Sequence, residues 1–170
     1  MPVCCVMKKH CELSEKEWND IAFLKDQHWP HGTESQKAWI ARNFEDDDVH
    51  LLLYQADEAV AYASLNVICC MIDSRKENVL GLGGVCVAKT HQKQGLGKKI
   101  VECANEYITM SQQPGLLLCH KELTGFYNLC GWEMVNYERA FVAEAVFEHF
   151  VMSFRKRYGD VKSLIIPKNF

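Results

Sequence analysis

Residues 85–110 constrain the fold more than any other stretch of the chain. An apolar run at residues 85–88 leads into a polar segment at residues 89–94 and then into two glycines, Gly95 and Gly97. Apolar side chains follow with helical spacing on one face, at Leu96, Ile100, Val101, Cys103, Ala104, Tyr107 and Ile108. The pattern predicts a strand, a tight loop and a long helix that begins at the glycines.

The charges around the start of this helix point to a ligand. No acidic residue occurs there before Glu102, whereas five basic side chains do: Lys89, His91, Lys93, Lys98 and Lys99. A helix N-terminus is already positive because of its free N–H groups, so lysines there are unfavourable unless an anion lies between them. Glycines let a backbone approach a ligand closely. The combination predicts a phosphate site; the alternative is a solvated basic loop before an ordinary core helix.

Two common phosphate motifs do not fit these residues. A Walker A loop, G-x-x-x-x-G-K-[ST], would need glycine at Gln92 and a hydroxyl residue at Lys99. The dinucleotide-binding fingerprint would need a third glycine at Ile100. What the segment does contain is Q-x-x-G-x-G, at residues 92–97.

This string resembles the acyl-CoA pyrophosphate loop of the GNAT N-acetyltransferase superfamily. Residues 125–132, with Phe126, Tyr127, Gly131 and Trp132, resemble the F-Y-x-x-x-G-[FW] signature of the same superfamily. The two motifs stand in the expected order with the expected elements between them. The resemblance extends from the first predicted helix to the last predicted strand.

The resemblance implies an α/β (α+β) fold with a mixed, twisted, mostly antiparallel sheet that is flanked by helices and splayed between its fourth and fifth strands. Acetyl-CoA, the co-substrate, would lie in that cleft, with its pantetheine arm on the fourth strand and its pyrophosphate on the loop. The expected cofactor-binding residues are Val85, Cys86, Val87, Gln92, Lys93, Gln94, Gly95, Leu96, Gly97 and Lys98.

The implied reaction is direct attack of a primary amine, expected to belong to a small molecule, on the thioester carbon. A backbone N–H near Val87 could polarise the thioester carbonyl. By resemblance Tyr127 protonates the leaving thiolate; the alternative is a core tyrosine that packs a short helix.

The general base is not identified by the motifs. Many relatives carry an acid on or beside the fourth strand, but residues 81–85 contain no carboxylate. His120, at the end of the fifth strand, and His31, in a Trp-Pro-His-Gly loop, are candidates because histidine titrates near neutral pH. Each could equally be a surface or capping histidine. Without a recognised base, a non-catalytic acyl-CoA-binding or sensing module is the alternative function.

Composition bounds the class of protein. The chain has 170 residues, of which 48% are hydrophobic, as expected for one domain spanning residues 1–170. A net charge of -3 argues against general attraction to nucleic acid, and no run is long and apolar enough to span a bilayer.

The nine cysteines are odd in number and contain no C-x-x-C, so we expect reduced thiols in a cytoplasmic protein and no metal site. A monomer or homodimer acting on a small-molecule amine is expected.

Other elements follow from capping and alternation. Helices are predicted after the capping boxes at Ser14 and Thr33, the first ending near Gln27, and at residues 122–130. Strands are predicted at residues 3–7, 50–54, 60–70, 79–87, 116–119, 132–137 and 147–154. Residues 141–149 could instead be helical, and residues 155–170 form a tail. Gly81, Gly83 and Gly84 suggest a bulge, or close approach of a ligand's amide chain.

Overall fold

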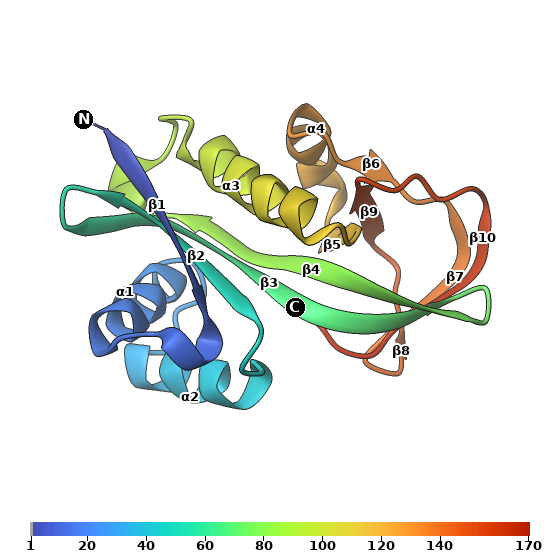
Figure 1. Cartoon of the computed structure of the whole chain (residues 1–170), viewed down its shortest axis with the longest axis horizontal. Coiled ribbons are helices and arrows are strands. Elements are labelled where there is room, and N and C mark those ends of the chain that lie inside the picture. Colours follow the sequence, from blue (N-terminus) through green and yellow to red (C-terminus); the bar gives the residue numbers. More distant parts are fainter. Residues whose placement is uncertain (1) are drawn as a thin grey trace. The chain divides into compact units, whose positions relative to one another are not determined.

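Helices and a mixed β-sheet make up the chain, which a computed structural model describes over residues 2–170 (Figure 1). Met1, where the predicted domain begins, lies outside the described residues. The elements in order are β1 (Val3–Lys9), η1 (His10–Glu12), α1 (Glu15–Asp26), α2 (Thr33–Asn43), β2 (Val49–Gln55), β3 (Glu58–Ile72), β4 (Arg75–Val87), η2 (Lys89–His91), α3 (Leu96–Ser111), β5 (Gly115–Cys119), α4 (Lys121–Leu129), β6 (Glu133–Met134), β7 (Tyr137–Val142), β8 (Ala145–Val146), β9 (Phe150–Phe154) and β10 (Val161–Ile166).

The internal contacts divide the chain into two units. Unit 1 comprises residues up to 66 together with residues 84–104, and unit 2 comprises residues 67–83 and 105–170. Each unit therefore receives one part of β3, one part of β4 and one part of α3.

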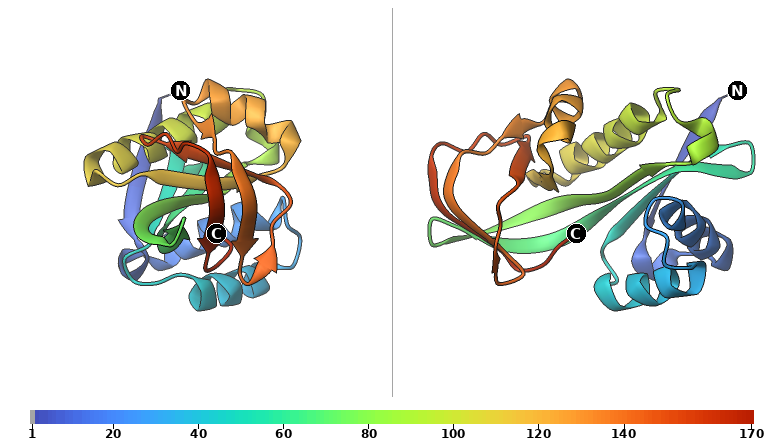
Figure 2. Two further views of the ribbon diagram at one scale, coloured as in Figure 1. Left: turned by 90° about the vertical axis from the view of Figure 1, so that its right-hand side faces the viewer. Right: turned by 180° about the vertical axis from the view of Figure 1, so that it is seen from behind.

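Unit 1 is built on antiparallel strands. β1 pairs with β2, and β2 pairs with β3. α1 and α2 lie on one side of these strands and the first turns of α3 on the other (Figures 1 and 2). The core under α1 and α2 consists of Ile21, Leu24, Ile40, Phe44, Leu52, Ala59, Tyr62, Cys86 and Ala88.

The two predicted capping boxes have different outcomes. The Ser14 box is confirmed, since the Ser14 side chain accepts from the Glu17 N–H and Glu17 accepts from the Ser14 N–H at 2.8 Å. The Thr33 box is wrong. Gly32 is the N-cap of α2, and the side chain of Gln36 donates instead to the carbonyl of Trp29 at 2.5 Å.

Unit 2 contains a parallel connection. β4 pairs in parallel with β5 from Leu80–Gly115 to Leu82–Leu117, and β5 pairs antiparallel with β9. β10 lies between β3, which is antiparallel to it, and β7, which is parallel to it (Figure 2). The fold class is confirmed as a mixed, mostly antiparallel sheet with helices.

The C-terminal third departs from the prediction. The strand predicted at residues 132–137 is only β6, two residues long, and the strand predicted at 147–154 is β9, five residues long. Residues 141–149 are not a helix, because they contain the end of β7 and the short β8 that pairs with it. The predicted tail contains β10.

Phe170 explains the glycines of β4 in unit 2. A Cβ on Gly81 would lie 2.8 Å from the ring of Phe170, and a Cβ on Gly83 would overlap the main-chain carbonyl of Phe170. The close approach predicted for a ligand at these two glycines is therefore made by the protein itself. A side chain at position 83, including a carboxylate, has no room.

The Gly83→Ala variant is expected to lose about 1–3 kcal/mol of unfolding free energy, the usual cost of overpacking a filled site. Its methyl group must displace the backbone of Phe170, which a side-chain rotation cannot relieve. Urea unfolding measures the change, with Gly159→Ala as the control because nothing lies within 4 Å of its Cβ position. Equal stability of the two variants would show that Phe170 does not pack on Gly83.

Candidate active site

The connection between β4 and α3, in unit 1, has the backbone geometry of an anion site. Lys93 and Gly95 both have positive φ, 62° and 78° respectively, just before α3 begins at Leu96. Left-handed residues in such a turn direct successive N–H groups into a concavity that suits an anion. A Cβ on Gly95 would meet open space, so its φ alone requires glycine there.

The N–H groups of this connection are available. Within residues 2–170, the main-chain N–H groups of residues 92–98 have no protein acceptor, and the ladder of α3 starts with Lys99 N–H donating to the carbonyl of Gly95 at 3.1 Å. Residues 92–95 are exposed, and only Leu96, 7% exposed, points into the core. The concavity is therefore open and is not filled by the protein's own side chains.

The charge around the concavity is positive. Lys89, Lys93, Lys98 and Lys99 are exposed, and the first turn of α3 has no acidic residue. Lys98 lies 3.7 Å from Glu102, but both side chains are more than half exposed, so this pair is weak. An anion with two or more charges would meet free N–H groups, a helix dipole and several lysines at one place.

Two residues that the sequence analysis missed hold the end of β4. His28 Nε2 donates to the carbonyl of Val87 at 2.7 Å, and Gln27 accepts from the N–H of Lys89 at 2.8 Å. The carbonyl of Val87 thus already accepts a hydrogen bond from the protein. No motif marks His28 or Gln27; their only signal is that they follow directly on the predicted end of α1.

Cys86 is a packing residue in unit 1. It is 5% exposed, and burial raises the pKa of its thiol to about 12. The thiol is therefore neutral near pH 7 and a poor nucleophile. This supports a reaction without an acyl-cysteine intermediate.

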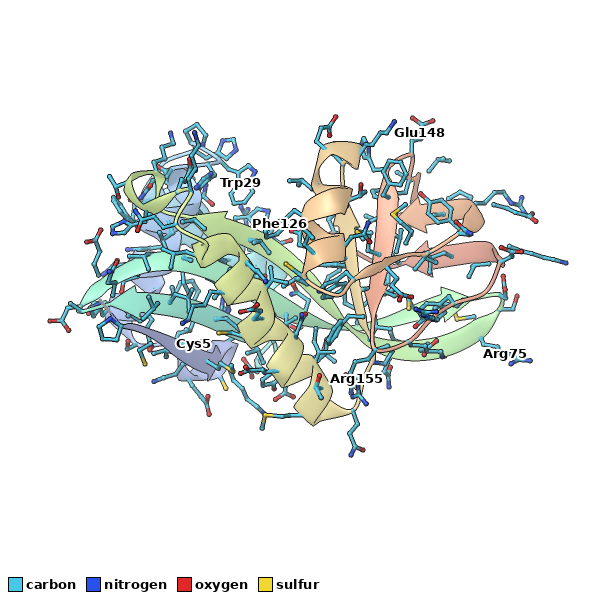
Figure 3. All side chains as sticks on the ribbon, turned by 90° about the horizontal axis from the view of Figure 1, so that it is seen from above. Cys5, Trp29, Arg75, Phe126, Glu148 and Arg155 are labelled. Carbon is cyan, nitrogen blue, oxygen red and sulfur yellow. The ribbon has the colours of Figure 1, made fainter. Side chains whose placement is uncertain are left out.

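Tyr127 belongs to α4 in unit 2, one residue after Phe126, which is labelled in Figure 3. Its side chain is 8% exposed, and its hydroxyl has no hydrogen-bond partner within residues 2–170. Burial raises the pKa of the hydroxyl above its ordinary value. Tyr127 therefore stays protonated over the physiological pH range and is able to donate a hydrogen bond.

The two predicted histidines lie in different units. His31, in unit 1, is exposed between α1 and α2, and its main-chain N–H donates to Asp26 at 2.9 Å. His120, in unit 2, is the exposed N-cap of α4, and its ring centroid lies 4.1 Å from that of His149. Neither ring is built into a buried site.

A hollow of about 830 Å³ also opens in unit 1 beside the loop. Its walls include His91 and Gln94, but also Asp20, Asp57 and Glu58. Asp20 is engaged by Lys16 at 2.7 Å and by the hydroxyl of Tyr54 at 2.6 Å. The carboxylates make this hollow unsuitable for a phosphate. The concavity between β4 and α3, which is surrounded by lysines, suits a phosphate better.

Other site types find little support in the described part of the chain. No group of three or more His, Cys, Asp or Glu within residues 2–170 could hold a metal ion. No helix in the same range combines the length and apolar character needed to cross a membrane.

Solved structures share the fold. Escherichia coli ElaA is 21% identical with a TM-score of 0.66, and the match covers 91% of this chain and 100% of that chain. An aminoglycoside 6'-N-acetyltransferase complexed with coenzyme A is 12% identical with a TM-score of 0.65, covering 91% and 99%. The ribosomal-protein-S18-alanine N-acetyltransferase from Escherichia coli is 14% identical with a TM-score of 0.61, covering 92% and 97%. No curated protein matches the chain.

The family follows from the sequence match. The model of the acetyltransferase (GNAT) family matches residues 12–132, which is more than half of the chain. The matched range contains the loop at residues 92–97 and both Phe126 and Tyr127. The chain therefore belongs to the GNAT acetyltransferase family.

Proposed function

We propose that this protein is an acetyl-CoA-dependent N-acetyltransferase that moves an acetyl group to a primary amine of a small molecule by direct attack. The observation that carries the proposal is the open, basic concavity between β4 and α3, in which the N–H groups of residues 92–98 lack a protein acceptor. The family match and the neighbour complexed with coenzyme A support the same ligand.

Each site residue has a proposed role. The main-chain N–H groups of Gln92, Lys93, Gln94, Gly95, Leu96, Gly97 and Lys98 bind the pyrophosphate, and the side chains of Lys93 and Lys98 balance its charge. Val85 and Cys86 pair with the pantetheine amides, and an N–H near Val87 polarises the thioester carbonyl. Tyr127 donates the proton that the leaving thiolate needs.

The general base is assigned less firmly than the general acid, Tyr127. His120 and His31 stay as predictions for this role, since either could accept a proton through water. Both are exposed, so neither is held in a fixed orientation by burial.

A non-catalytic acyl-CoA sensor is the second candidate. It is favoured by one observation, namely that Phe170 fills the space beside Gly81 and Gly83 and leaves no room for a carboxylate on that part of β4. The protonated hydroxyl of Tyr127 favours the enzyme instead.

Two measurements test the proposal. Thermal shifts with acetyl-CoA, CoA and ATP test the binding site: we expect stabilisation by both thioester and thiol and little by ATP. Release of free thiol from acetyl-CoA, with tyramine, spermidine, kanamycin, L-lysine and a short peptide as acceptors, tests the chemistry. Stabilisation without thiol release from any amine would favour the sensor, and no stabilisation would contradict both candidates.

The remaining features of the proposal concern organisation and context. We propose that residues 1–170 act as a single domain, as a monomer or homodimer, without nucleic-acid or membrane partners. A cytoplasmic location is supported by the nine cysteines, none of which forms a disulfide within residues 2–170.

A further inference from the structure

A buried lysine in unit 1 has no role in the site described so far. Lys25, near the end of α1, is 7% exposed, yet within residues 2–170 its side-chain amine has neither a hydrogen bond nor an ion pair with a carboxylate. Its Nζ lies instead over aromatic rings, 4.8 Å from the centroid of Trp39, 5.2 Å from that of Trp29 and 5.8 Å from that of Tyr62 (Trp29 is labelled in Figure 3). Lysines are almost never buried without a partner.

The amine faces β4 where the strand turns toward the predicted pantetheine site. Gly84 has a φ of +63°, and a Cβ built on it would lie 3.7 Å from Lys25 Nζ. The next residue, Val85, is the first that we expect to pair with CoA. A group on the Cβ side of Gly84 would therefore lie against the amine of Lys25.

The amine lies beside two exposed side chains. Lys25 itself is only 7% exposed, but Trp29 and Trp39, whose rings its Nζ contacts, are 42% and 39% exposed.

The surroundings make the amine easier to deprotonate than an exposed lysine. Burial lowers the pKa of Lys25, and the titratable groups that face it are uncharged near pH 7. These are Cys86 on β4, whose pKa burial raises to about 12, Tyr62 on β3, whose pKa burial also raises, and His50 on β2, whose pKa burial lowers to about 3. The three rings favour the ammonium form, so they limit the shift without removing it.

We propose that Lys25 is the general base of acetyl transfer, taking the place of the carboxylate that β4 lacks. The inference rests on the proposed function. Neutral Lys25 Nζ takes one proton from the acceptor's ammonium group and becomes an ammonium itself. The acceptor nitrogen then forms its bond to the thioester carbon, and the C–S bond breaks with its electron pair passing to sulfur. The nitrogen's second proton passes to the thiolate by way of Tyr127, its third remains on the amide, and Lys25 returns its proton to water.

The pH dependence of Lys25→Met and Lys25→Arg tests the role. With acetyl-CoA and tyramine or spermidine, whichever gives faster thiol release, we expect Lys25→Met to lower kcat/KM about 100-fold near pH 7. Its rate should then rise about tenfold per pH unit toward pH 10, since only hydroxide and water remain to deprotonate the amine. Lys25→Arg should be as poor, because arginine cannot give up its proton. Lys37→Met on α2, a half-buried lysine paired with Glu34 at 3.2 Å, is the control and should behave as the wild type.

Several results would overturn the role. Full activity of Lys25→Arg would mean that the positive charge holds an anionic acceptor, and a wild-type pH profile for Lys25→Met would remove Lys25 from proton transfer. Loss of the acidic limb in His120→Ala or His31→Ala, with Lys25→Met unaffected, would transfer the role to that histidine.

A readout without an acceptor separates this inference from the proposed function. The ¹³Cε resonance of Lys25, assigned by its loss in Lys25→Arg, should titrate below the ordinary lysine value of about 10.4. Titration at or above that value would overturn the base assignment even if the enzyme is active. The CoA-induced thermal shift should be the same in wild type, Lys25→Met and Lys25→Arg. Absence of that shift in the wild type would contradict the proposed CoA site and would say nothing against Lys25.

Discussion

Gly97→Glu should abolish CoA binding. Gly97 lies in the first turn of α3, among the N–H groups that have no protein acceptor. A carboxylate there would occupy the concavity and repel a pyrophosphate, by about 1 kcal/mol for charges 4 Å apart in water and about 4 kcal/mol near a protein surface. Because two phosphates are repelled and the carboxylate also takes their N–H groups, we expect affinity to fall by more than about 100-fold. Isothermal titration with CoA measures the change.

The design separates binding from folding. An acidic residue in the first turn of a helix is favourable with the macrodipole, so Gly97→Glu should unfold no earlier than the wild type. Gly159→Glu is the charge-matched control, since Gly159 is exposed and its Cβ position is open. Normal CoA affinity in Gly97→Glu would refute the phosphate assignment, and reduced affinity in Gly159→Glu would trace the effect to net charge.

The elements with strong local signals were predictable. The helical spacing after Gly97 predicts α3, and the Ser14 capping box predicts the start of α1, because both signals arise from neighbouring residues. The same holds for the end of α4, where Gly131 has a φ of +88° as expected of a residue that follows a helix.

Elements that depend on distant partners were not predictable. β10 pairs with β3 through Leu164–Ile72 and with β7 through Leu164–Ala140, partners that a single sequence does not reveal. Gln36 has the spacing of a capping box, but its side-chain amide donates to the carbonyl of Trp29 instead of capping α2. The glycines at positions 81 and 83 signal close approach correctly, and only the fold identifies Phe170 as the approaching group.

In the candidate site, too, some residues have a local sequence signal and others depend on distant partners. The loop at residues 92–97 can be recognised in the sequence from its glycine spacing and its charge, because both signals arise from neighbouring residues. Lys25 falls four residues after the buried Ile21, so a lysine on the apolar face of α1 was a readable signal. Its aromatic surroundings come from the following loop, from α2 and from β3, which no periodicity brings together.

Tyr127→Phe should lower turnover about 100-fold, the lower end of what a positioned general acid contributes, and leave CoA affinity unchanged. Burial raises the pKa of Tyr127, which makes it a weaker acid, but a leaving thiolate that is held out of water is correspondingly more basic. The donor and the acceptor thus remain matched closely enough for proton transfer. Steady-state thiol release gives kcat, and titration with CoA gives the affinity.

Stability should not contribute to that loss. Phenylalanine keeps the ring of Tyr127, and the hydroxyl that it removes has no protein partner within residues 2–170, so the unfolding free energy should change by no more than about 0.5 kcal/mol. Tyr107→Phe, on the half-buried side of α3, is the matched control and should turn over normally. Because the lost proton donor acts on the thiolate, a thioester with a more acidic leaving thiol should be affected less than acetyl-CoA. Turnover of Tyr127→Phe equal to that of Tyr107→Phe would remove Tyr127 from the chemistry and leave thiolate protonation to water.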